Sequence, residues 1–152
     1  MILGVGDNAT RRKLAGVVVA RQFVLGLAIH PRATIASDVR IGAGTVVAAG
    51  AVVNPNATLG ENVIVNTCAS VDHDCVVGNT VHLSPGARLA GTVQIGDETW
   101  IGLGAVVLEG RSVGLRTLVG AGAVVTRSLP SNVVAYGAPA KVIRDRIATE
   151  LG

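Results

Sequence analysis

Aliphatic residues recur at every sixth position along most of the chain. Seventeen consecutive positions of this register, from Ile29 to Val125, hold isoleucine, valine or leucine without a slip. The position four residues after each is also restricted, being alanine, valine, threonine or cysteine from Ala33 to Ala123, except at Arg111. A helix repeats every 3.6 residues and a strand every two, so neither element can keep this register.

Residues suited to tight corners follow the same interval. Seven of the seventeen aliphatic residues are followed directly by glycine, and residue types that tolerate a positive φ often stand three positions on: Gly44, Asn56, Asn62, Asp74, Gly86, Gly104 and Gly122. A six-residue unit of short strand and corner buries its apolar side only by stacking on further copies, which is typical of a β-solenoid. Three units close a triangular coil of 18 residues. The sequence therefore predicts that residues 18 apart stack in columns, with about 4.8 Å between successive rungs. One such column contains Ile29, Val47, Val65, Leu83, Ile101 and Val119.

The segments on either side of the repeat have a different pattern. "GDNATRRKLAGVVVARQ" predicts a helix, with Asp7 or Asn8 as its cap, and "FVLGLAI" predicts a strand leading into the solenoid. Pro130 and Pro139 follow the repeat, and a short C-terminal helix is expected after them. We therefore expect a partial α/β segment over 1–28, a β-helix over 29–129, and a closing loop and helix over 130–152.

Composition excludes several classes of function. Only three residues are aromatic although 49% are hydrophobic, which indicates a thin, repetitive interior. No apolar stretch reaches the roughly 20 uncharged residues of a membrane span, and the start lacks a secretory-signal pattern, so we expect a cytoplasmic protein with two reduced thiols, Cys68 and Cys75. The formal charge of +3, without a dense basic face, argues against nucleic acid and favours a small polyanion as partner.

Two longer segments carry a resemblance to a known family. "NTCASVDHDCVVGNTVHLSPGARLAG" at 66–91 and "VGAGAVVTRSLPSNVVAYGAPAKVIR" at 119–144 resemble the sialic-acid and bacterial amino-sugar O- and N-acetyltransferases of the hexapeptide-repeat acyltransferase superfamily. The resemblance implies a left-handed parallel β-helix, a homotrimer, acetyl-CoA as co-substrate and a sugar as acceptor. Members usually begin with a βαβ nucleotide-sugar-binding unit. "MILGVGDN" resembles only the closing part of that unit, so we expect a shortened N-terminal domain.

The predicted catalytic centre is His73, which lies between Asp72 and Asp74. An imidazole with an ordinary pKa near 6.5 is largely neutral at cellular pH and can accept the acceptor's proton. A neighbouring carboxylate can hold its tautomer and support the charge it acquires. The resemblance assigns that part to Asp74, while the residues alone leave Asp72 open, and a merely solvated polar corner is the alternative for all three.

The 18-residue coil places other candidates around His73. Gly91 lies one rung along, and the resemblance implies that its N–H binds the thioester oxygen; a corner glycine is the alternative. His82 lies half a coil from His73, so the two can share a site only across a subunit boundary, which predicts a composite site in a trimer. There, His82 would contact the co-substrate and Trp100 would cover the cleft, unless both only pack an interface. Asn66 would orient the acceptor or satisfy a corner.

The predicted enzyme transfers acetyl directly from acetyl-CoA to a sugar amine or hydroxyl. Lys141 in "GAPAK" resembles the family's contact to the phosphates of coenzyme A, and Arg127 and Arg144 are further candidates. Cys75 occupies an inward position, which argues against a covalent thiol intermediate, whereas Cys68 lies on a corner. Two alternatives remain: a non-catalytic or degenerate scaffold, and a metalloenzyme resembling the γ-class carbonic anhydrases, for which His30 lies far from the other two histidines.

Overall fold

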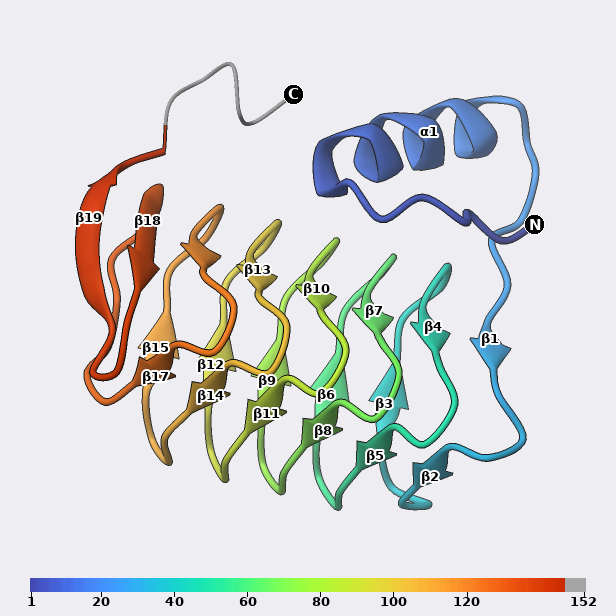
Figure 1. Ribbon diagram of the computed structural model, residues 1–152. Helices are drawn as coiled ribbons and strands as arrows, with labels where there is room; N and C mark the ends of the chain where they lie inside the picture. Colours follow the sequence, from blue (N-terminus) through green and yellow to red (C-terminus); the bar gives the residue numbers. More distant parts are fainter. Residues whose placement is uncertain (147–152) are drawn as a thin grey trace.

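The computed structural model describes residues 1–146 and shows a parallel β-solenoid with one helix outside it (Figure 1). An eight-stranded sheet contains β1 (Ala28–Ile29), β4 (Val46–Val47), β7 (Ile64–Val65), β10 (His82–Leu83), β13 (Trp100–Ile101), β16 (Leu118–Val119), β18 (Val133–Tyr136) and β19 (Lys141–Asp145). A six-stranded sheet contains β2 (Thr34–Ile35), β5 (Val52–Val53), β8 (Ser70–Val71), β11 (Arg88–Leu89), β14 (Val106–Val107) and β17 (Val124–Val125). A five-stranded sheet contains β3 (Arg40–Ile41), β6 (Thr58–Leu59), β9 (Val76–Val77), β12 (Gln94–Ile95) and β15 (Ser112–Val113).

The coil has the predicted circumference of 18 residues. His82 pairs with Ile64 on one side and Trp100 on the other, and the same offset holds in the other sheets. Every sixth residue from Gly44 to Gly122 has a positive φ, including the non-glycine residues Cys68, Thr80 and Arg116. The sequence-based prediction of a hexapeptide β-helix is therefore confirmed, and the corner conformation is imposed by stacking even where the residue type does not favour it.

The interior contains the predicted aliphatic and small residues. The aliphatic residues from Val47 to Val125 are almost fully buried, and Cys75 is buried beside them as expected. The column begins differently, because the side chain of Ile29 is 46% exposed in the first coil, which has no coil stacked beneath it. Arg111, the exception to the small-residue rule, is exposed and donates from Nε to the carbonyl of Thr126 at 3.0 Å.

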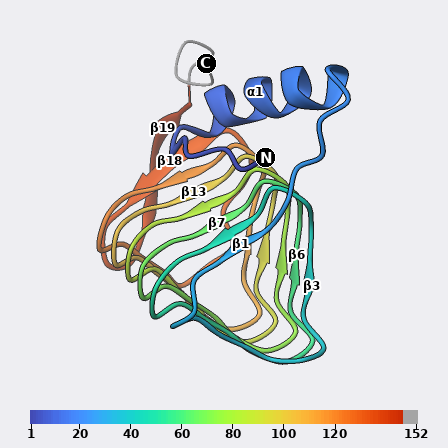
Figure 2. The same ribbon diagram turned by 90° about the vertical axis from the view of Figure 1, so that its right-hand side faces the viewer.

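Helix α1 (Asn8–Ala20) lies along one corner of the solenoid, outside the coils (Figures 1 and 2). Asp7 is its N-cap and accepts a hydrogen bond from the backbone N–H of Thr10 at 2.8 Å, which confirms one of the two predicted caps. The strand predicted over 23–29 is limited to Ala28–Ile29, because the N–H of Gly26 instead donates to the carbonyl of Met1. Within residues 1–146, no helix is long and apolar enough to cross a membrane.

A buried arginine attaches α1 to the solenoid. The side chain of Arg11 is 1% exposed and donates to carbonyls of the corners, Asn62 at 2.9 Å and Thr80 at 3.0 Å. It also donates to the carbonyl of Gly6 at 2.8 Å and to Oδ1 of Asn8 at 2.8 Å. Burial lowers the pKa of Arg11 to about 10, so the guanidinium stays charged at neutral pH. Nothing in the sequence shows which of the two adjacent arginines, Arg11 or Arg12, turns inward.

The C-terminal region corrects one prediction. Where a helix was expected after Pro139, Lys141–Asp145 form the strand β19, which pairs antiparallel with β18. β18 in turn pairs parallel with β16, so the hairpin forms the last two strands of the eight-stranded sheet. Val142 and Ile143 are β-branched and favour this strand over a helix. The rest of the expected helix lies in 147–152, outside the described residues.

Candidate functional site

His73 stands on the corner between β8 and β9, where the chain passes from the six-stranded to the five-stranded sheet. Backbone hydrogen bonds to the coils on both sides hold this corner. The carbonyl of His73 accepts from the N–H of Thr92 at 2.9 Å, and the N–H of Asp74 donates to the carbonyl of Pro55 at 3.1 Å. Asp74 has a φ of 58°, and the residue at this corner position has a positive φ in every unit from Gly44 to Gly122. The imidazole is thus carried by rigid backbone while its ring remains exposed.

The two carboxylates beside His73 have different contacts. Oδ2 of Asp74 lies 2.8 Å from Nδ1 of the imidazole. Oδ1 of Asp72 accepts instead from the backbone N–H of His73 at 2.8 Å and from Nδ2 of Asn54, one coil away, at 2.9 Å. The positive φ of Asp74 turns its side chain toward the ring of the preceding residue, although consecutive side chains usually diverge. The structure therefore pairs His73 with Asp74, the choice that the residues alone left open.

This pair determines how the imidazole can act. A carboxylate only accepts hydrogen bonds, so the neutral ring carries its proton on Nδ1 and presents an unprotonated Nε2. The hydrogen bond to Asp74 raises the pKa of His73 above its usual value, and the charges of Asp72, Asp74 and Glu109 act in the same direction. An imidazole in this setting can take a proton at Nε2 and is stabilised once it is charged.

Gly91 lies directly beneath the ring of His73, one coil along. A Cβ atom at position 91 would lie 2.6 Å from both Nε2 and Cε1 of the imidazole, so only glycine leaves room for the ring as it is placed. Among the described residues, none accepts a hydrogen bond from the N–H of Gly91. A backbone donor without a partner therefore stands beside the unprotonated nitrogen.

His82 is placed quite differently, in β10 of the eight-stranded sheet. Its side chain is 7% exposed and lies under the N-terminal segment, with Nδ1 at 3.1 Å from the carbonyl of Gly6. Because that carbonyl can only accept, the proton is on Nδ1, and Nε2 accepts from Nδ2 of Asn66 at 3.2 Å. The ring of Trp100 stacks on the imidazole at a centroid distance of 4.7 Å. Burial lowers the pKa of His82 and keeps the ring neutral.

The other predicted site residues lie apart from His73 within one chain. Asn66 is grouped with His82, and Lys141 begins β19 at the C-terminal end of the solenoid, where Arg144 follows on the same strand. Arg127 is exposed just after β17. A single chain therefore brings together His73, Asp74 and Gly91, and separately His82 and Asn66. The roles assigned to these residues stay predictions.

The remaining candidates concern a thiol and a metal. Cys75 is buried, and burial raises the pKa of its thiol, whereas Cys68 is exposed on a corner. Nδ1 of His30 accepts from the backbone N–H of Arg32 at 3.1 Å in the first coil. Over residues 1–146, no three side chains of the metal-binding types are grouped closely enough to hold an ion.

Sequence reasoning missed the link from Asn54 to Asp72. The signal for it was present, since the two residues are 18 apart and therefore stack on neighbouring coils. The hydrogen bond from Asn54 holds the carboxylate of Asp72 near the backbone N–H of His73, so Asp74 is the carboxylate that contacts the imidazole.

Comparison with solved structures gives high similarity to several bacterial proteins, among them an acetyltransferase domain. The acetyltransferase domain of PglB from Neisseria gonorrhoeae is 43% identical, with a TM-score of 0.92, and the match covers 93% of this chain and 69% of that one; a second structure of the domain contains acetyl coenzyme A. PerB from Caulobacter crescentus, in complex with CoA and GDP-perosamine, is 44% identical with a TM-score of 0.92, covering 93% and 68%. WeeI from Acinetobacter baumannii is 30% identical with a TM-score of 0.89, covering 93% and 69%. No protein-family model and no curated protein sequence matches the chain.

Proposed function

We infer the function of this protein from its family, because the chain belongs to the hexapeptide-repeat acetyltransferases. It transfers an acetyl group from acetyl-CoA to an amino or hydroxyl group of a sugar. Relatives support the sugar class, since PerB is described with GDP-perosamine. The observation that carries the proposal is the His73–Asp74 pair above Gly91, an arrangement suited to acyl transfer.

The first step is attack by the acceptor on the thioester carbon. As the nitrogen or oxygen of the acceptor forms its bond to the acetyl carbon, Nε2 of His73 takes the proton that the acceptor releases. Asp74 acts as a positioning residue, because it holds Nδ1–H in place and stabilises the imidazolium. The tetrahedral intermediate then collapses, the C–S bond breaks, and the proton passes from His73 to the departing thiolate. No covalent enzyme intermediate is needed, and the buried Cys75 takes no part.

The oxyanion of the tetrahedral intermediate is bound by the N–H of Gly91. This donor has no partner among the described residues and lies on the coil next to His73. A preorganised donor of this kind costs no rearrangement when the charge develops.

The complete site lies between two subunits of a homotrimer. Within one chain, His73 occupies a corner and His82 lies in the opposite sheet, so the two surfaces meet only when another copy of the chain packs against them. His82, Asn66 and Trp100 then form the facing wall, and Lys141, with Arg127 and Arg144, meets the phosphates of the coenzyme. A cytoplasmic location, where the thiols of Cys68 and Cys75 stay reduced, belongs to the same proposal.

The test is a thiol-release assay with acetyl-CoA and a panel of acceptors. The panel contains GDP-perosamine, other nucleotide-linked 4-amino sugars and sialic acid, and it also separates N- from O-acetylation. His73→Ala should lower turnover by a factor of about 10² to 10⁴, the usual contribution of a general base, while binding of acetyl-CoA measured by calorimetry is retained. Near-normal turnover in His73→Ala would show that another group takes the proton. Absence of saturable acetyl-CoA binding at millimolar concentration would instead favour the non-catalytic scaffold.

A further inference from the structure

A crevice separates α1 from the solenoid on the side away from His73. Its volume is about 500 Å³, within the range of small-molecule sites. It follows the corner between the five-stranded and eight-stranded sheets, whereas His73 stands on the corner between the six-stranded and five-stranded sheets. On one chain the crevice is therefore separate from the residues proposed to act in acetyl transfer.

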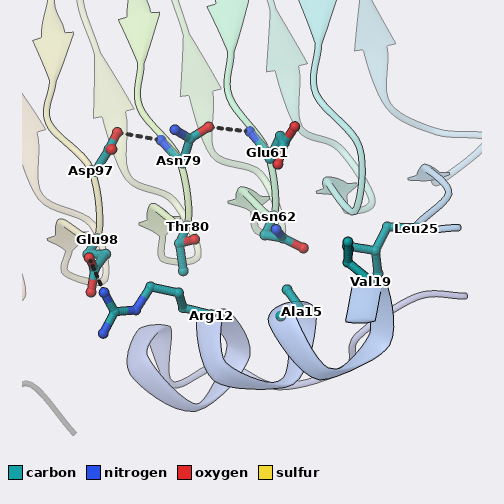
Figure 3. Close-up of a pocket in the computed structure, with 11 residues that line it drawn as sticks. Arg12, Ala15, Val19, Leu25, Glu61, Asn62, Asn79, Thr80, Asp97 and Glu98 are labelled. Atoms are coloured by element: carbon teal, nitrogen blue, oxygen red, sulfur yellow. Dashed lines mark hydrogen bonds and ion pairs between the residues drawn. The ribbon is translucent and has the colours of Figure 1, made fainter. Parts of the chain in front are cut away.

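One wall of the crevice is a ladder of polar side chains on successive coils. Oδ1 of Asn79 accepts from the backbone N–H of Glu61 at 2.8 Å, and Oδ1 of Asp97 accepts from the N–H of Asn79 at 2.7 Å (Figure 3). Glu61 and Asp97 are two coils apart, so their backbones are separated by roughly 10 Å at the usual strand spacing. The ladder holds both carboxylates on the rim at a set separation.

The charge of this lining is negative although the whole chain is positive. The lining contains the carboxylates of Glu61, Asp97 and Glu98 and, among residues 1–146, one cation, Arg12. The buried Arg11 lies behind the lining, where it donates to the carbonyls of Asn62 and Thr80, so the three carboxylates still outnumber the two cations. Arg12 is already paired with Glu98 at 3.1 Å. An anion such as a phosphate would be repelled here, so the crevice is not suited to the phosphates of the coenzyme.

An unsatisfied acceptor lies at the base of the crevice. The side chain of Asn62 is 6% exposed, and its Oδ1 has no hydrogen-bond partner. Figure 3 shows the amide of Asn62 directed toward the side of the crevice where Val19 and Leu25 lie. A buried acceptor left unpaired costs about 1–3 kcal/mol. This oxygen is packed against Gly44, so a donor in the crevice reaches it when the Asn62 side chain turns toward the crevice. The opposite wall, with Ala15, Val19 and Leu25, is apolar.

We propose that this crevice binds an aliphatic polyamine, with its ammonium groups on the Glu61–Asp97 ladder and Asn62 and its hydrocarbon chain against α1. An ammonium group has three donors and no acceptor, which matches a wall of carboxylate and amide oxygens. Methylene groups between the ammonium ions match the apolar wall of Ala15, Val19 and Leu25. A bare divalent ion fits less well, because within residues 1–146 no three potential ligands converge on one point.

The experiment is a titration of the full chain with spermidine, followed by calorimetry and by backbone amide shifts. We expect saturable binding with a Kd below about 1 mM, and shifts centred on residues of the crevice. 1,6-Hexanediol, which has the hydrocarbon chain without the charges, should not bind. His73→Ala should leave the spermidine Kd unchanged, so this result does not depend on the proposed acetyl transfer.

Charge-removing variants locate the site. Glu61→Gln combined with Asp97→Asn keeps the side-chain shapes, including the Asp97 acceptor for Asn79, and should raise the Kd at least about tenfold. Asp38→Asn is the matched control, because Asp38 also accepts from a neighbouring coil, from the N–H of Asn56 at 3.0 Å, but lies on another corner. Asp38→Asn should leave the Kd unchanged.

A filling variant provides an independent result. Gly16 lines the crevice on α1, and a Cβ atom added there meets no atom within 4 Å, so Gly16→Leu fills space without a clash at its first carbon. It should abolish spermidine binding while leaving the circular dichroism spectrum unchanged. The proposal is overturned if no saturable binding is found, if Asp38→Asn weakens binding as much as the double variant, or if Gly16→Leu binds normally.

Discussion

Gly91→Ala gives the most direct test of the arrangement around His73. The added methyl carbon would lie 2.6 Å from Nε2 and Cε1 of the imidazole. Ordinary contacts between such atoms begin near 3.5 Å, so the ring must move by about 1 Å. The φ of Gly91 lies outside the left-handed region, so alanine fits the backbone itself. The ring is exposed and can turn away. We therefore expect Gly91→Ala to displace the imidazole without disturbing the packing of the core.

The expected loss follows from that displacement. A misplacement of about 1 Å in a catalytic group can cost a factor of about 10² in rate, equivalent to roughly 2.7 kcal/mol of transition-state stabilisation. We therefore expect kcat/KM for acetyl transfer to fall at least about a hundredfold in Gly91→Ala, while acetyl-CoA binding and the melting temperature change little. Gly4→Ala is the control, because a Cβ atom at Gly4, unlike one at Gly91, meets nothing within 4 Å.

A double variant distinguishes this cause from simple damage. If Gly91→Ala acts by moving the imidazole, then adding it to His73→Ala should cost little more than His73→Ala alone. Steady-state thiol release on the two single variants and the double variant measures this. Turnover of Gly91→Ala above half that of the parent protein would refute the reasoning, as would independent, multiplying losses in the double variant.

Further predictions concern the charge on His73 and the attachment of α1. His73 must be neutral to act as a base, and its pKa is raised, so kcat/KM should fall as the pH drops through a value above 6.5. Asp74→Asn removes the largest cause of the raised pKa, so with the same acceptor the midpoint of this fall should move to lower pH. If the midpoint does not move in Asp74→Asn, the fall of kcat/KM at low pH is due to the protonation of a group other than His73. Arg11→Met should destabilise α1 by about 3 kcal/mol or more, because buried carbonyls lose their donor, and hydrogen exchange of the helix amides should show it. Arg12→Met, which removes a surface ion pair, should cost less than about 1 kcal/mol in the same measurement, and equal effects of the two variants would contradict the buried clamp.

The solenoid could be predicted almost completely because its information is local and periodic. Each six-residue unit carries an inward aliphatic side chain, and a fixed interval of 18 residues follows from closing three units. The first and last coils depart from the pattern because each lacks a regular coil on one side. No coil stacks on the outer side of the first, and a hairpin stacks on the last. Ile29 is therefore half exposed, and a hairpin covers the last coil where a helix had been predicted.

The candidate site was only partly predictable. Spacing alone brings His73 next to Gly91, but the choice of Asp74 over Asp72 depends on a positive φ and on the bond from Asn54, which require the folded corner. Nor could spacing show that His82 lies buried under the carbonyl of Gly6, because that contact joins residues 76 positions apart through an irregular segment.

Contacts within the repeat follow from the order of residues, since a constant period converts separation along the chain into position in space. Contacts between the repeat and α1 do not, because a helix packed on a corner has no period in common with the coils. The buried Arg11, the exposed Arg12 next to it and the unpaired oxygen of Asn62 all depend on how that helix is docked, and they became evident only once the two parts were seen together.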